Sequence, residues 1–171
     1  PARIGTAAKG AALVVSVLVL VIGVGLAAGF EAGGEQYQFV ESHAWIPAFG
    51  TRYILGLDGI ALSLVLLTAV LAPLLLAAGW NDVRVDDRPK GIHTYVSLIL
   101  VVESMVLISF LALDVFLFYI FFEAMLIPMY FLIGGFGHTK GPKRSAAALK
   151  FLLYNLFGGL KFYRAARGAG V

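Results

Sequence analysis

Two glutamates lie inside runs of apolar residues that are long enough to cross a lipid bilayer. Glu123 lies near the middle of the run DVFLFYIFFEAMLIPMYFLIGGFGH, and Glu103 lies in the apolar segment that precedes it. A carboxylate at the centre of a membrane helix costs about 2.5–3.5 kcal/mol even on the scale derived from insertion experiments. Such a cost is tolerated where protons, ions or a buried partner need the group. The two side chains therefore predict transport chemistry.

The chain between the two glutamates predicts that they lie at a similar depth. Asp114 stands between the apolar segments 92–112 and 115–133, so these segments are expected to form a tight antiparallel hairpin. Each glutamate is about ten residues from the turn, or roughly 15 Å at 1.5 Å per residue. If the carboxyl groups also face each other, they could exchange protons. The alternative is that each carboxyl only hydrogen-bonds a neighbouring helix.

Two further residues could take part in this chemistry. Pro128 has no amide hydrogen, so the carbonyl of Ala124 loses its helical donor and could hold water; an ordinary helix kink is the alternative. Lys150 lies a turn or more inside the last apolar segment, after a basic loop. Its ammonium could point inward and couple to the glutamates, or extend to the membrane interface. The candidate proton-translocation residues are thus Glu123, Glu103 and Lys150.

The composition is that of a membrane protein. The chain has 171 residues, 60% of them hydrophobic, and the apolar residues fall in long blocks. The absence of cysteine excludes disulfides and thiolate catalysis, and the three histidines are too scattered to form a metal cluster. No nucleotide loop or redox ligand set is visible, so we expect no cofactor in this chain. The net charge of +3 comes from loops between apolar blocks and does not indicate nucleic-acid binding.

Five apolar segments approach the roughly 20 residues that a helix needs to cross the hydrocarbon. They cover residues 11–30, 56–80, 92–112, 115–133 and 146–160. The sequence therefore predicts an all-α, polytopic membrane domain over residues 1–160, a helix bundle with about five transmembrane helices. The first segment could instead be a signal peptide, but its apolar run exceeds the usual length of about 7–15 residues. Residues 31–56 are too polar to cross and are expected to form an outer loop at the headgroups.

Basic residues predict the orientation of these segments. One side would receive Arg3, Lys9, Arg84, Arg88, Lys90, Lys140, Lys143 and Arg144, and the other side only Arg52 before the tail. The positive-inside rule then places residues 1–10, 81–91 and 134–145 in the cytoplasm. We expect a multi-pass protein of the cell inner (plasma) membrane. The basic tail at 161–171, KFYRAARGAGV, breaks this pattern, because its charges would follow the fifth segment on the outer side.

Three runs of the chain resemble one family. The runs FVESHAWIPAFGTRYILGLDGIALSLVLLTAVLAPL, FLFYIFFEAMLIPMYFLIGGFGH and AALKFLLYNLFGG are similar to subunit M (chain 4) of the proton-translocating NADH-quinone oxidoreductase, respiratory complex I. The resemblance covers nearly all of residues 1–160. Related antiporter-like subunits of cation/proton antiporters share the fold and the mid-membrane glutamate, so a cation/proton antiporter subunit is the nearest alternative.

The resemblance implies an antiporter-like fold of about fourteen spans built from inverted repeats, of which this N-terminal fragment would hold spans two to six. On that mapping Glu123 corresponds to the family's fifth-span carboxylate and Glu103 to its fourth-span glutamate. Lys150 corresponds to a lysine at the start of the sixth span. The family's seventh-span lysine, which pairs with the fifth-span glutamate, would lie beyond this sequence.

The resemblance also implies a function and partners. The parent subunit would couple electron transfer from NADH to quinone, carried out elsewhere, to proton translocation. NADH, FMN, iron-sulfur clusters and quinone would be bound by other subunits of the complex. The partners would be other membrane-arm subunits of complex I and the lipid bilayer. The atypical basic tail after Leu160 leaves a non-functional truncated remnant as a further alternative.

Overall fold

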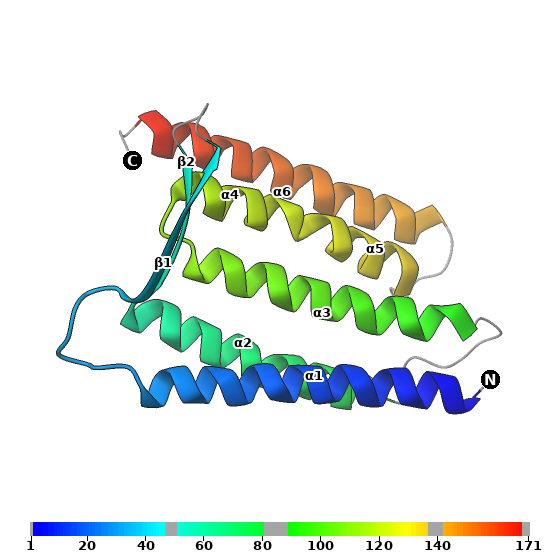
Figure 1. Cartoon of the computed structure of the whole chain (residues 1–171). Helices are drawn as coiled ribbons and strands as arrows, with labels where there is room; N and C mark the ends of the chain where they lie inside the picture. The colour runs from blue at the N-terminus through cyan, green and yellow to red at the C-terminus, as the bar shows by residue number, and fades with distance from the viewer. Residues whose placement is uncertain (1, 47–50, 81–88, 137–141, 169–171) are drawn as a thin grey trace.

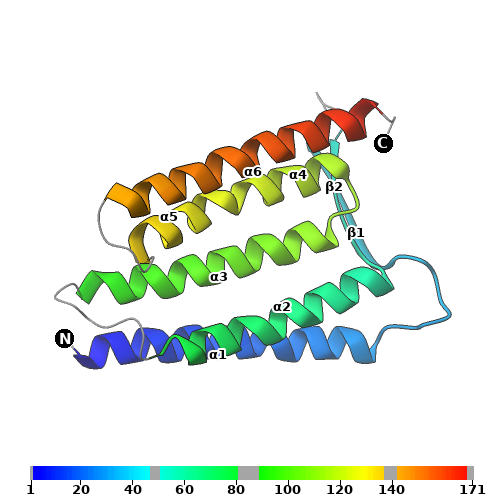
Figure 2. The same ribbon diagram turned by 180° about the vertical axis from the view of Figure 1, so that it is seen from behind.

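The protein is a layered bundle of helices with one small β-hairpin at its end. The computed structural model describes residues 2–46, 51–80, 89–136 and 142–168. The helices are α1 (Ala2–Ala28), α2 (Gly59–Ala78), α3 (Pro89–Leu111), α4 (Val115–Ala124), α5 (Leu126–Phe136) and α6 (Pro142–Gly168). Figures 1 and 2 show α1 and α2 on one side, α3 in the middle, α4 and α5 next, and α6 outermost.

Four segments of the described chain are long and apolar enough to cross a membrane. They are Gly5–Ala28, Gly59–Ala78, Gly91–Leu111 and Val115–Phe136, the last made of α4 and α5 together. The predicted helical, multi-pass membrane fold is therefore confirmed. Helix α6 is not among the four, but it runs alongside α4 and α5 (Figure 1) and continues without a break through residues 161–168.

Two aspartates set the starts of α2 and α4. The Asp114 carboxylate accepts hydrogen bonds from the amides of Phe116 and Leu117, at 2.8 and 3.1 Å. Asp58 accepts one from the amide of Ala61 at 2.6 Å. These bonds satisfy amide groups that have no partner within the first turn of a helix. Asp114 thereby allows α4 to begin directly after α3, and the predicted antiparallel hairpin of these two segments is confirmed.

The segment 31–56 was expected to be a loop, and this expectation is wrong for most of it. Strand β1 (Gln38–Ile46) pairs antiparallel with β2 (Thr51–Leu57). Both stretches contain β-branched and aromatic residues, which favour strands once a partner strand can pair with them. The amide of Leu113 donates to the carbonyl of Ile54 at 3.0 Å, so β2 is tied to the turn between α3 and α4.

Small residues at Gly56 and Ala12 allow the hairpin and α1 to pack closely against the rest of the bundle. A Cβ on Gly56 would lie 2.6 Å from Leu113 Cδ1, so any other residue at this position would force the Leu113 side chain to shift. Ala12 of α1 is buried with Leu76 and Val96. Helix α1 thus packs as an integral part of the bundle, which favours the membrane-span interpretation over the signal-peptide alternative.

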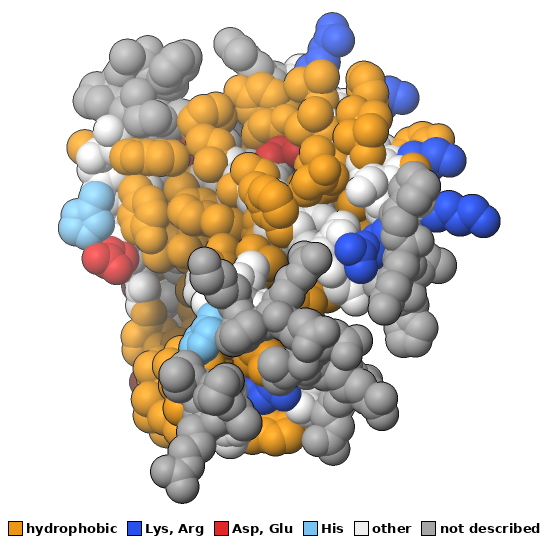
Figure 3. Space-filling model, turned by 90° about the vertical axis from the view of Figure 1, so that its right-hand side faces the viewer, with side chains coloured by type: hydrophobic (Ala, Val, Ile, Leu, Met, Phe, Trp, Pro, Cys, Tyr) orange, Lys and Arg blue, Asp and Glu red, His pale blue; other side chains and the backbone are white. Residues whose placement is uncertain are grey.

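The two ends of the bundle are formed by different elements. The hairpin and the α3–α4 turn lie at one end, whereas the N-terminus and the starts of α3 and α6 lie at the other (Figure 1). Figure 3 looks onto the latter end and shows hydrophobic side chains over much of the described surface, with Lys and Arg concentrated along one margin. Arg84, Arg88 and Lys140, together with Pro47 and Phe49 of the expected outer loop, lie outside the described residues.

This arrangement predicts opposite labelling of the two ends. The chain contains no cysteine, so Ser42→Cys in the hairpin and Ser145→Cys in α6 introduce single reactive thiols at exposed positions. A membrane-impermeant maleimide added to intact cells should label Ser42→Cys, and should label Ser145→Cys only after permeabilisation, because the positive-inside rule predicts that the basic loop before α6 lies in the cytoplasm. Labelling of both variants from the same side would contradict the arrangement of the helices.

Candidate functional site

Glu123 lies one residue before the end of α4, at a break in the fourth apolar segment. Helix α4 ends at Ala124, and α5 begins after Met125. Pro128 cannot donate to the carbonyl of Ala124, so the regular helical ladder is interrupted directly after Glu123. The amide of Met125 still donates to the carbonyl of Phe121 at 3.1 Å, which keeps the two helices in line. The structure therefore has a helix break before Pro128, as both interpretations of this proline predict.

The carboxyl group of Glu123 lies against the backbone of α6. A methyl group built on Gly159 would overlap Glu123 Oε1 and stand 2.9 Å from the carboxyl carbon. It would also come within 3.4 Å of Tyr119 Cε2, so Tyr119 borders the same contact. Both carboxyl oxygens of Glu123 are shielded, and neither has a hydrogen-bond partner in the described part of the chain. A bare charge in such surroundings is costly, so a proton or a cation must neutralise it.

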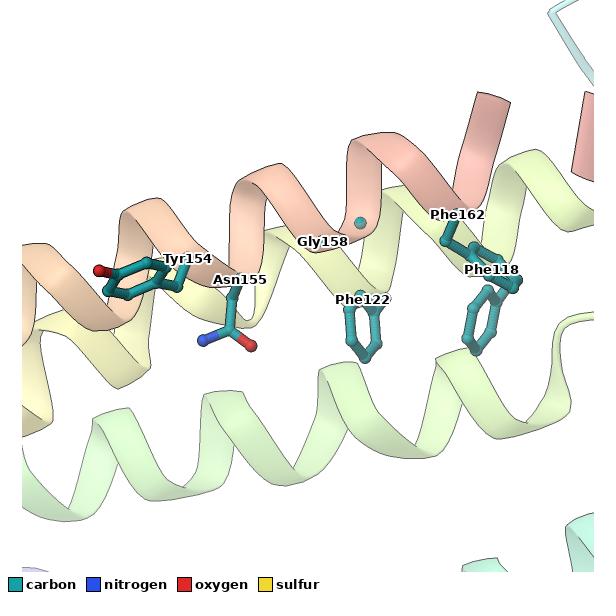
Figure 4. Close-up of a pocket in the computed structure, with 7 residues that line it drawn as sticks. Phe118, Phe122, Tyr154, Asn155, Gly158 and Phe162 are labelled. Atoms are coloured by element: carbon teal, nitrogen blue, oxygen red, sulfur yellow. The ribbon is translucent and has the colours of Figure 1, made fainter. Parts of the chain in front are cut away.

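The aromatic residues of α4 pack against α6 around this contact. Tyr119 stacks on Tyr163 with 4.9 Å between ring centroids, and Phe118 meets Phe162 edge to face at 5.9 Å. Beside them α4 and α6 border an open cavity of about 310 Å³. Residues that line this cavity are shown in Figure 4 and include Phe118, Phe122, Tyr154, Asn155, Gly158 and Phe162. These aromatic side chains pack α4 against α6.

Glu103 lies in a different groove. Its side chain is 5% exposed, and it lines a cavity of about 240 Å³ between α2, α3 and α5 with Thr68, Ala72 and Met129 among its neighbours. Its Oε1 is buried and makes no hydrogen bond to any described residue. The hydroxyl of Ser104 beside it in sequence donates to the carbonyl of Leu100 at 2.8 Å, on its own helix. Glu103 is thus a second buried carboxyl in apolar surroundings.

The two glutamates share a depth but not a face. Glu103 lies eight residues before the end of α3 and Glu123 eight residues after the start of α4, which places each about 12 Å from the turn. Glu103 faces the groove between α2 and α5, whereas Glu123 contacts α6. The predicted similar depth agrees with the structure, and the carboxyl groups do not meet.

Lys150 points away from Glu123. It is exposed on α6 and lies nine residues before Gly159. At 100° per residue this separation is half a turn in azimuth, and it amounts to about 13 Å along the helix axis. Lys150 and Gly159 therefore occupy opposite faces of α6. Among the described residues, the three candidates Glu123, Glu103 and Lys150 occupy three separate surroundings.

The residue that sequence reasoning missed is Gly159. The sequence feature that points to it is the pair Gly158 and Gly159, which stands in a segment whose other residues are mostly bulky. Glycines on a membrane helix allow another helix to approach closely. The sequence alone does not show that the approaching group is the carboxyl of Glu123.

Comparison with known proteins connects these elements to one kind of membrane subunit. A family model described as NADH:quinone oxidoreductase/Mrp antiporter, TM, matches residues 112–166. NADH-quinone oxidoreductase subunit M of Mycobacterium tuberculosis (strain ATCC 25618 / H37Rv) is 57% identical over 94% of this chain and 33% of that protein.

Two more distant relatives agree. NADH-quinone oxidoreductase subunit M of Rhodobacter capsulatus is 43% identical over 88% of this chain and 27% of its own length. NADH-ubiquinone oxidoreductase chain 4 of Arabidopsis thaliana is 37% identical over 77% of this chain and 25% of its own length. The chain thus spans about a quarter to a third of the relatives that it matches.

The groove around Glu103 predicts a stability difference between two substitutions. Glu103→Leu replaces an unpartnered buried carboxyl by an apolar group of similar size and should stabilise the protein by about 1–3 kcal/mol. Glu103→Ala also removes the carboxyl but leaves a cavity, so it should be less stable than Glu103→Leu. Thermal unfolding of purified protein in detergent measures both. A Leu variant less stable than the Ala variant would show that the groove does not accept an apolar side chain.

Proposed function

Because this chain is homologous to NADH-quinone oxidoreductase subunit M over most of its own length, we propose that it forms part of a membrane-arm subunit of respiratory complex I. In this proposal the parent subunit couples electron transfer from NADH to quinone to proton translocation across the cell inner (plasma) membrane. The observation that carries it is the Glu123 carboxyl, which lies in a four-span bundle with both oxygens shielded and unpartnered among the described residues. Such a group is suited to take up and release a proton.

Each candidate residue has a separate role in this proposal. Glu123 binds the proton, because its charge has no partner within the described bundle and must be neutralised there. Pro128 cannot donate to the nearby carbonyl of Ala124, so a water molecule bound to that carbonyl could deliver the proton. Glu103 is a second proton-binding site at the same depth in the next groove.

Lys150 would act on Glu123 only at a distance. It lies half a turn and about 13 Å away along α6, too far for an ion pair. Its positive charge can still change the proton affinity of Glu123, because a Coulomb interaction over a given distance is stronger across a low-dielectric interior than through water. This makes Lys150 an electrostatic partner in the proposal, and Glu123 the residue that holds the proton.

The cofactors of the reaction would belong to other subunits. NADH, FMN, iron-sulfur clusters and quinone are assigned to those subunits, and groups of three or more metal-ligating side chains are absent from the described part of this chain. The partners proposed here are other membrane-arm subunits and lipid. The large apolar side chains exposed on α1 and α6, such as Ile22, Tyr154 and Phe157, provide surfaces that such neighbours or lipid would cover.

Substitution of Glu123 tests the proposal. In membranes whose assembled oxidoreductase carries this sequence within a full-length subunit M, Glu123→Gln should preserve assembly but abolish most proton pumping, since the amide cannot exchange a proton. Pumping is measured as pH change in vesicles after addition of NADH, with NADH oxidation in uncoupled vesicles as the control for assembly. Undiminished pumping by Glu123→Gln would overturn the assignment.

A cation/proton antiporter subunit is the second candidate, because the matching family model includes antiporters in its description. The two functions differ in what drives proton movement. The complex I subunit should pump protons on NADH addition when choline replaces Na⁺ and K⁺ in the medium. An antiporter should instead move protons in response to an imposed Na⁺ or K⁺ gradient, without NADH. Proton movement that requires the cation gradient and ignores NADH would favour the antiporter.

A further inference from the structure

We propose that Gly159 is a positioning residue for the Glu123 carboxyl, and that the missing side chain at this position provides the space the carboxyl occupies. This inference rests on the proposed function of Glu123. The contact joins α4 to α6, and a methyl group at Gly159 would overlap Glu123 Oε1. Gly159 itself holds no proton; it determines where the carboxyl lies.

Packing holds the carboxyl of Glu123 in place. Neither of its oxygens has a hydrogen-bond partner within the described residues, so no directional bond fixes it. Its location follows from the backbone of α6 at Gly159 on one side and from Tyr119, one helical turn earlier on α4, on the other. A change of shape at this contact therefore moves the carboxyl without breaking a hydrogen bond.

The overlap would be relieved at the flexible end of a side chain. The atoms of Glu123 that a methyl group would meet belong to the carboxyl, which can rotate away while the helices keep their places. Alanine also favours a helix more than glycine does. Gly159→Ala should therefore leave the fold intact and displace the proton-binding group.

Gly158 is the matched control. It precedes Gly159 on the same helix, and a Cβ built on it meets nothing within 4 Å. Gly158→Ala makes the same chemical change in the same helix and gains the same helix propensity. A difference between the two alanine variants therefore reports on the contact with Glu123.

The first experiment compares Gly159→Ala and Gly158→Ala in the assembled oxidoreductase that carries this sequence in a full-length subunit M. Proton pumping per NADH should fall by between about tenfold and a hundredfold in Gly159→Ala, as expected when a reacting group is displaced by about an ångström. Gly158→Ala should keep pumping within about twofold of the unsubstituted complex. Equal losses in the two variants would overturn the proposal.

A second measurement follows the carboxyl directly, without relying on pumping. Dicyclohexylcarbodiimide labels protonated carboxyls in apolar surroundings, and mass spectrometry resolves labelling at Glu123 from labelling at Glu103. In Gly159→Ala the pH midpoint for labelling of Glu123 should shift by about one unit or more, while that of Glu103 stays constant. An unchanged midpoint at Glu123 would show that its carboxyl has not moved.

A shortened side chain provides the rescue. Glu123→Asp retracts the carboxyl by one methylene, so an alanine at position 159 no longer overlaps it. Gly159→Ala should then cost at least about fivefold less pumping in the Glu123→Asp background than in the unsubstituted one, a non-additive result expected of residues in contact. Additive losses would contradict the contact.

The outcomes separate this proposal from the proposed function. If Glu123→Gln keeps full pumping but Gly159→Ala still shifts the labelling of Glu123, the position is correct and the pumping role is wrong. If Glu123→Gln abolishes pumping while Gly159→Ala behaves like Gly158→Ala, the pumping role stands and the positioning role is wrong.

Discussion

The low availability of hydrogen-bond partners inside an apolar bundle is the constraint on which the rest of this structure depends. Every backbone amide and carbonyl in such a setting must be satisfied by the chain itself, which favours continuous helices. The same need for partners applies to buried polar side chains. Glu123 and Glu103 do not meet it, because they have buried carboxyl oxygens without partners among the described residues. The cost of such groups is the reason to look for function there and not in the loops.

The constraint also explains how the bundle is tied together at one end. Asp114 satisfies two amides at the start of α4 and permits an abrupt turn. Strand β2 then bonds to that turn through the Leu113 amide, so the hairpin covers polar backbone that would otherwise be left open. Together these contacts set the register of α3 against α4. The two glutamates, each eight residues from the turn, are consequently held at one depth.

A glycine contact and a helix break meet at the same residue. Pro128 interrupts the ladder after Glu123, and Gly159 leaves room for its carboxyl on α6. Pro128 lacks an amide hydrogen, and Gly159 lacks a side chain. The result is a carboxyl placed by the shape of its surroundings instead of by hydrogen bonds, which leaves its own bonding capacity available for a proton or a cation.

The sequence by itself determined the helical membrane fold, the depth of the two glutamates and the role of Asp114, because long apolar runs and a single polar break allow few other structures. It did not reveal the β-hairpin, since strand pairing depends on a partner and on the turn at Leu113. Only the tertiary structure decided that Glu103 and Glu123 face different grooves and that Lys150 points away from both. The rotation of each helix about its axis is set by side-chain packing against its neighbours, as at Gly159. A helix that is apolar on all sides has no polar face from which this rotation could be predicted.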